Sequence, residues 1–118
     1  MWTAEQLRAI NEDGNLLVSA AAGAGKTAVM TERIARIIAS GTDVSEILVV
    51  TFTNPAAAEM KQRIERRLSE LAESTDDTKL KMHLHDSAIN ISTANISTIH
   101  SFCGNVLRRN CHIVGLDP

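Results

Sequence analysis

Aromatic residues and cysteines are scarce in this sequence. Trp2, Phe52 and Phe102 are the only aromatics among 118 residues, and there are only two cysteines, Cys103 and Cys111. The cysteines lie close together on what the pattern predicts to be one helix. Two such thiols indicate reduced side chains rather than a disulfide framework, which favours a reducing compartment.

A strong charge of either sign is also missing. Twelve basic and 14 acidic residues give a net charge of −2, so bulk basicity does not announce nucleic acid, although a local basic stripe would be enough to bind it. No apolar run approaches the roughly 20 residues that cross a bilayer. The opening MWTAE lacks the basic start and apolar core of a secretory leader. We therefore expect a cytoplasmic protein without a membrane partner, and the length allows one domain at most.

The most informative stretch is LLVSAAAGAGKT at residues 16–27. Its apolar start predicts a buried strand over Leu16–Ala20, and a loop of small residues then leads into a helix that begins at Lys26. This layout is typical of a phosphate-binding loop, in which inward-facing N–H groups and a helix N-terminus meet phosphate oxygens. Lys26 would contact the β- and γ-phosphates, and the Thr27 hydroxyl would ligate Mg²⁺. Ala20 stands where the usual pattern has glycine, and an ordinary strand-turn-helix corner is the alternative.

Helices and strands alternate along the rest of the chain. We expect a short helix from Thr3 to Ile10 with Thr3 as its N-cap, and a second strand over Ile47–Phe52 that is buried on both faces. Asn54 should cap the helix that follows, with Pro55 at its first position. The other expected elements are helices over 26–40, 78–89 and 101–111 and a strand over 95–98. The last helix should bury Phe102, Val106 and Leu107, and the charged residues of the helix after Pro55 should form a solvated face. The alternation predicts an α/β fold with a three-stranded parallel sheet.

Three further segments resemble a known family: TAEQLRAI at 3–10, TFTNPAAAEM at 51–60 and ISTIHSFC at 96–103. With the phosphate loop, they resemble the N-terminal end of superfamily 1A DNA helicases, the UvrD/Rep/PcrA/RecB group. They look closest to the larger, helicase-bearing chains (the A chains) of AddAB-type ATP-dependent helicase/nucleases of double-strand break repair. The resemblance implies that residues 1–118 are the N-terminal part of motor domain 1A, with a partial RecA-like P-loop NTPase fold.

The resemblance also implies the roles of individual residues. Gln6 matches the glutamine that reads the adenine edge of ATP, because an amide can donate and accept at once. The ATP and Mg²⁺ site maps onto the phosphate loop, with Lys26 and Thr27 as its catalytic members: Ala22, Gly23, Ala24, Gly25, Lys26, Thr27 and Ala28. Two segments match contacts with single-stranded DNA: Phe52, Thr53 and Asn54, and Thr98, His100 and Ser101. Pro55 replaces the usual Lys, Arg or Ala, and it suits a helix start.

Some parts of such a motor are missing from the sequence. The only segment that could supply the acidic Walker B group is Ile113–Asp117, which contains a glycine and is interpreted as a turn. The chain is therefore expected to be a fragment that does not hydrolyse ATP alone. The remaining motor domains and a B-type nuclease subunit would be its partners in the parent complex, and the isolated fragment could self-associate.

Several interpretations stay open beside this one. The chain could be a complete small P-loop enzyme such as a nucleotide kinase, or an inactive folding unit. Phe52 could be the end of a core strand rather than a stacking platform. The histidines His83, His85 and His112, taken with the cysteines, match no zinc spacing.

Overall fold

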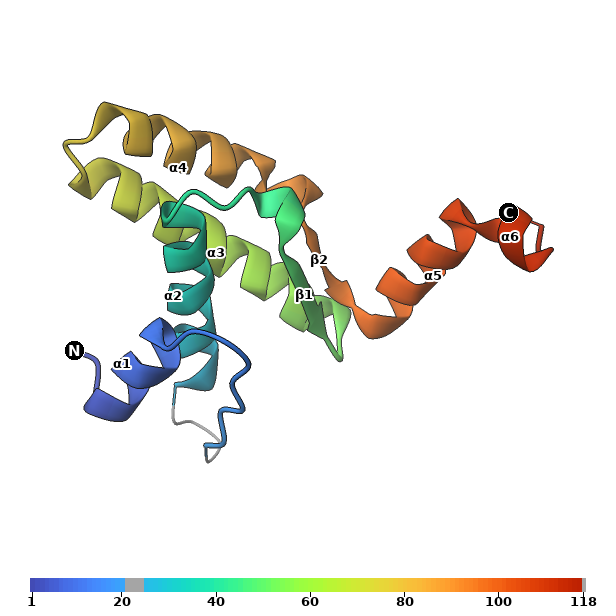
Figure 1. Cartoon of the computed structure of the whole chain (residues 1–118), viewed down its shortest axis with the longest axis horizontal. Coiled ribbons are helices and arrows are strands. Elements are labelled where there is room, and N and C mark those ends of the chain that lie inside the picture. The colour runs from blue at the N-terminus through green and yellow to red at the C-terminus, as the bar shows by residue number, and fades with distance from the viewer. Residues whose placement is uncertain (21–24, 118) are drawn as a thin grey trace.

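The computed structural model describes residues 1–20 and 25–117, and it is mostly helical (Figure 1). A two-stranded sheet lies near the middle of the molecule, and a helical arm projects from it. The elements, in chain order, are α1 (Ala4–Asn11), α2 (Lys26–Ala39), η1 (Val44–Glu46), β1 (Leu48–Thr51), α3 (Asn54–Ser74), α4 (Thr78–Asn90), η2 (Ile91–Thr93), β2 (Asn95–Thr98), α5 (Ile99–Arg109) and α6 (Cys111–Val114).

Local signals define where the helices begin. Thr3 caps α1 in a capping box with Gln6, as the sequence predicts. Thr53 caps α3 by accepting from the backbone N–H of Ala56, so the prediction that Asn54 is the cap was wrong by one residue. Asn54 is instead the first helical residue, and Thr53 has the extended backbone that a cap requires.

The hydrophobic core lies where α2, α3 and α4 meet the buried face of the sheet. Helices α3 and α4 pack side by side as a hairpin, and α2 crosses them (Figure 1). The largest fully buried side chains are Ile38, Ile64, Leu68 and Leu84. Val49 and Ile96 carry this core into the sheet from β1 and β2. The core therefore fixes the helices whose first turns carry the predicted site.

The sheet is smaller than expected. Strands β1 and β2 pair in parallel, with Leu48 opposite Asn95 and Thr51 opposite Thr98. The predicted strand over Leu16–Ala20 was wrong, because these residues form no strand and Leu17 is 96% exposed. A strand needs a neighbour to accept its backbone hydrogen bonds, and this run lies apart from the sheet.

Burial of β1 on both faces was also predicted and is not found. Val49 is buried, but Leu48 and Val50 on the opposite face are 49% and 44% exposed. Strand side chains alternate between faces, and within the described residues only one face of this sheet is covered. The result is a one-sided sheet with an uncovered apolar strip.

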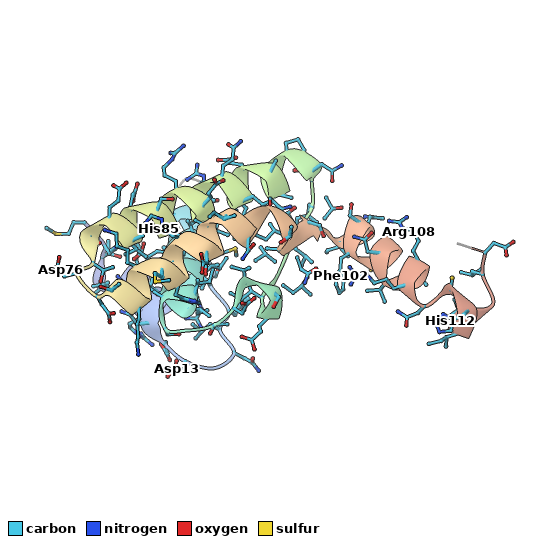
Figure 2. The ribbon with its side chains drawn as sticks, turned by 90° about the horizontal axis from the view of Figure 1, so that it is seen from above. Asp13, Asp76, His85, Phe102, Arg108 and His112 are labelled. Carbon is cyan, nitrogen blue, oxygen red and sulfur yellow. The ribbon has the colours of Figure 1, made fainter. Side chains whose placement is uncertain are left out.

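The C-terminal arm differs most from expectation. The predicted helix 101–111 is divided into α5 and α6, and α5 buries none of its residues. Phe102 is half-buried, and Val106 and Leu107 are exposed, because the arm projects away from the core (Figures 1 and 2). Ile113 belongs to the short helix α6, which ends at Gly115 with φ +70°, so the segment predicted as a turn begins in a helix. Cys103 and Cys111 are free thiols on different helices.

Candidate nucleotide and DNA site

The described end of the phosphate loop is the start of α2. Gly25 caps this helix with φ +79°, a left-handed conformation that favours glycine. Lys26 and Thr27 are exposed in its first turn, which holds no acidic residue. The free N–H groups and the dipole of α2 thus meet no carboxylate from their own turn and present a positive end to an anion. The predicted contacts at Ala22, Gly23 and Ala24 lie outside the described residues.

Gln6 lies beside this helix start although it is 19 positions away in sequence. A Cβ added to Gly25 would come within 3.3 Å of Gln6 Nε2. The Oε1 atom of Gln6 accepts from the Thr3 backbone N–H at 2.9 Å, which fixes the side chain. Gln6, Lys26 and the extended residues 18–20 line one cavity of about 280 Å³. The structure therefore brings the predicted adenine reader and the predicted phosphate ligand to the same hollow.

Two arginines of α2 hold α1 in this place. The Arg33 Nη1 atom donates to the backbone carbonyls of Ala9 at 2.9 Å, Glu12 at 2.7 Å and Ile10 at 3.4 Å. Arg36 Nη1 donates to Asn11 Oδ1 at 2.6 Å. A cation at the last carbonyls of a helix satisfies acceptors that have no partner within the helix. The position of Gln6 thus depends on side chains that the sequence pattern did not single out.

The two predicted DNA segments follow the carboxyl ends of neighbouring parallel strands. Because Thr51 pairs with Thr98, residues 52–54 and 99–101 leave the sheet at the same edge. Phe52 is 92% exposed, so the alternative that it ends a core strand is not what the structure shows. An aromatic side chain at this edge is available to stack on a base.

The side chains around Phe52 differ in how available they are. Thr53 uses its hydroxyl to cap α3, and Thr98 is buried and caps α5 by accepting from the Ser101 N–H at 3.1 Å. Thr98 also donates to Ser101 Oγ at 2.9 Å. Asn54 and His100 are exposed on the first turns of their helices. Thr98 is therefore placed to shape this edge, whereas Phe52, Asn54 and His100 face solvent.

A second cavity joins the two predicted sites. It has a volume of about 440 Å³ and is lined by Lys26 and Thr27 on one side and by Phe52 and Thr53 on the other. Glu59 and Met60 complete its α3 wall. Lys26 thus borders both the hollow beside Gln6 and the one beside Phe52.

A buried carboxylate between α2 and α3 was missed by the sequence analysis. Glu32 of α2 is 3% exposed and accepts from Arg67 of α3 at 2.6 and 3.2 Å and from Arg36 at 2.9 Å. Burial alone would raise the pKa of Glu32, but the hydrogen bonds and positive charges of Arg67 and Arg36 outweigh it and lower that pKa. Arg67 is therefore not part of a purely solvated face, as had been expected. The spacing of Glu32 and Arg36 is visible in the sequence, whereas the contact with Arg67 depends on packing.

The metal expectation rests on Thr27. Its hydroxyl lies on an exposed first helical turn beside Lys26, a position that suits a Mg²⁺ ion carried by a triphosphate. Among residues 1–20 and 25–117, no group of three His, Cys, Asp or Glu side chains could hold a metal without such a ligand. In the same ranges, no helix is long and apolar enough to cross a membrane.

A helix-capped anion site beside a half-buried glutamine, next to an edge with an exposed aromatic, defines the class to which comparison with known proteins assigns the chain. The chain belongs to the UvrD/REP helicase N-terminal domain family, whose model matches residues 2–118. Membership implies a partial RecA-like fold, of which the structure shows a two-stranded parallel sheet with its helices.

Individual relatives narrow the assignment. They are the A chains of ATP-dependent helicase/nucleases, and this chain is 48% identical to that of Lactobacillus gasseri and 49% identical to that of Alkaliphilus metalliredigens. The corresponding protein of Clostridium botulinum is 48% identical. Each comparison covers 99% of this chain and 10% of the relative. The chain thus spans about a tenth of the length of the curated relatives it matches, and it is related to their N-terminal helicase-like part.

Proposed function

We propose that the chain binds Mg-ATP at the start of α2 and single-stranded DNA at the strand edge beside Phe52. Residues 1–118 then act as the N-terminal part of motor domain 1A of an ATP-dependent DNA helicase/nuclease. The observation that carries this proposal is the cavity of about 440 Å³ that Lys26 and Thr27 share with Phe52 and Thr53. Ligands on its two sides would be close neighbours, as a motor that couples ATP to DNA requires.

The nucleotide part rests on three features of one place. The positive end of α2 suits a triphosphate, Lys26 adds a mobile charge, and Gln6 stands where an adenine edge could meet its amide. Thr27 would hold the Mg²⁺ that accompanies ATP, and the ion would supply charge neutralisation at the β- and γ-phosphates. Lys26 and Thr27 are the residues that would act on the reacting phosphates.

The DNA part rests on exposure and position. Phe52 projects from the end of β1 without a covering neighbour among the described residues, so a base can stack on it whatever the sequence. Asn54, His100 and Ser101 are exposed nearby on the first turns of α3 and α5, where backbone N–H groups point outward. With a net charge of −2, long-range attraction is weak and stacking should carry much of the affinity.

The parent protein is inferred from the relatives. Because they are ATP-dependent helicase/nucleases, they support a role in DNA unwinding and degradation, and a B-type subunit is the expected partner. The remaining motor domains would provide the acidic group and the arginines that hydrolysis needs. The nucleotide-kinase alternative gains no support, because the late arginines Arg108 and Arg109 lie on the projecting arm.

Calorimetry with Mg-ATP tests the nucleotide site. Lys26→Ala removes a charge-assisted phosphate contact and should weaken binding by about 1.5–3 kcal/mol. Lys81→Ala is the matched control, because Lys81 is an exposed lysine on α4, outside the cavities that Lys26 lines. Equal binding by wild type and Lys26→Ala would remove the site from α2.

A further inference from the structure

The seam between α2 and α3 directly underlies the two sides of the shared cavity. Thr31 is buried and donates its hydroxyl to the Thr27 carbonyl at 2.8 Å, with Met60 Sδ at 3.7 Å. Thr27 and Met60 both line the cavity. The next residue of α2, Glu32, holds Arg67 through two hydrogen bonds. Thr31 and Glu32 therefore tie the helix of the phosphate loop to the helix that begins after Phe52.

This tie is rigid by its chemistry. An arginine that meets a carboxylate through two of its nitrogens fixes both distance and direction, and here the carboxylate is almost fully buried. Arg36 donates to the same carboxylate from one turn further along α2. Both helices also contribute to the same hydrophobic core, through Ile34 and Ile38 of α2 and Ile64 and Leu68 of α3, so they have little freedom to slide.

A rigid seam has a consequence for two anionic ligands. Mg-ATP keeps a net negative charge, and so does a DNA backbone, so the two repel each other when both occupy one cavity. If the helix starts could separate, this repulsion would be relieved. With the seam intact, each ligand must bind in the field of the other.

We propose that Glu32 is a positioning residue that fixes the separation of the nucleotide and DNA sites and thereby makes their ligands antagonistic. Thr31 supports the same spacing through Met60 and Thr27. Neither residue touches a ligand, and the effect is a coupling between sites. Because coupling is reciprocal, DNA must weaken ATP binding by the same factor as ATP weakens DNA binding. This inference rests on the proposed function.

The test measures oligo-dT affinity by fluorescence anisotropy with and without saturating Mg-ATP. In the wild type, Mg-ATP should weaken DNA binding by about fivefold or more, within the usual range of coupling between sites. In Glu32→Gln, this factor should fall below about twofold while each ligand alone still binds. Circular dichroism shows that the variants compared are folded.

Two further variants sharpen the test. Glu70→Gln removes an exposed carboxylate that pairs with the same Arg67 from within α3, so it should keep the wild-type factor. Thr31→Val keeps the side-chain shape without the hydroxyl, and it tests the seam independently if Glu32→Gln does not fold. Its factor should also fall toward one.

The outcomes separate the two levels of the argument. If wild type binds both ligands independently, or more tightly together, the inference is overturned and the proposed function stands. The inference is equally overturned if folded Glu32→Gln and Thr31→Val keep the wild-type factor. If wild type binds neither Mg-ATP nor oligo-dT, the proposed function fails, and the inference with it.

Discussion

Arg33 provides the sharpest link between packing and the nucleotide site. Its Nη1 atom donates to the carbonyls of Ala9 and Glu12 at 2.9 and 2.7 Å, and the contact with Ile10 is weaker at 3.4 Å. A hydrogen bond to a charged group contributes about 1.5–3 kcal/mol. The side chain is half-exposed, so water offsets part of two such bonds, and Arg33→Ala should weaken the docking of α1 by about 2 kcal/mol.

Trp2 reports this docking directly. It is the only tryptophan, it is half-buried, and it lines a cavity with Thr31, Glu32 and Arg67 just before α1. In Arg33→Ala, Trp2 emission should shift to the red, and its urea transition should precede the loss of helical circular dichroism. In the wild type, the two transitions should nearly coincide.

Arg8→Ala is the matched control for Arg33→Ala. Arg8 is an arginine of α1 whose contact with Glu12 is 3.4 Å long and exposed, and such a surface pair contributes less than about 1 kcal/mol. The control should leave the Trp2 transition in place. A Trp2 transition unchanged in Arg33→Ala, or moved further by Arg8→Ala, would refute the account of how α1 is held.

Four other outcomes are expected. Because the pKa of Glu32 lies below its ordinary value of 4.5, its contribution to stability is complete above that pH and is lost as the pH falls through the lowered value; acid titration of unfolding should show a smaller loss in Glu32→Gln. Phe52→Ala should weaken oligo-dT binding by about 1–3 kcal/mol in anisotropy measurements, and unchanged affinity would deny the stack. A malachite-green assay should show no ATP turnover by the chain alone, since its sequence lacks a convincing Walker B acid; turnover that disappears in Lys26→Ala would contradict this. Light scattering should show self-association through the half-covered strand of Ile47–Phe52, and a monomer at high concentration would mean that this edge is protected.

Elements with strong local signals were predictable from the sequence. The capping box of Thr3 and Gln6 places α1 to within a residue, and β2 was predicted with the bounds it has. These features depend on neighbours only a few residues away. The prediction for α4 also held to within one residue, because Asp77 caps it and apolar residues recur along one face.

Features that depend on distant partners were not predictable. The apolar run at 16–18 predicts a strand, yet a strand forms only where another supplies hydrogen bonds. Helix α5 is amphipathic, but burial of Val106 needs a surface to pack on, and the arm projects away from the core. Apolar periodicity shows which face would be buried and does not show whether anything covers it.

The candidate site divides in the same way. The phosphate-loop pattern and the segment around Phe52 are readable in sequence, and they led to residues that line one cavity. The bond between Glu32 and Arg67 joins positions 35 apart, and the capping of α1 by Arg33 joins positions more than 20 apart. No local pattern encodes such contacts, since the packing of helices creates them.

Chemical-shift mapping of the backbone amides is the most direct test that both ligands bind where proposed. On titration with Mg-ATP, the largest changes should fall on Gln6 and residues 25–28. On titration with oligo-dT, they should fall on residues 52–54 and on His100 and Ser101. Changes confined to α4 or to the arm of α5 and α6, with residues 25–28 and 52–54 unmoved, would contradict the account.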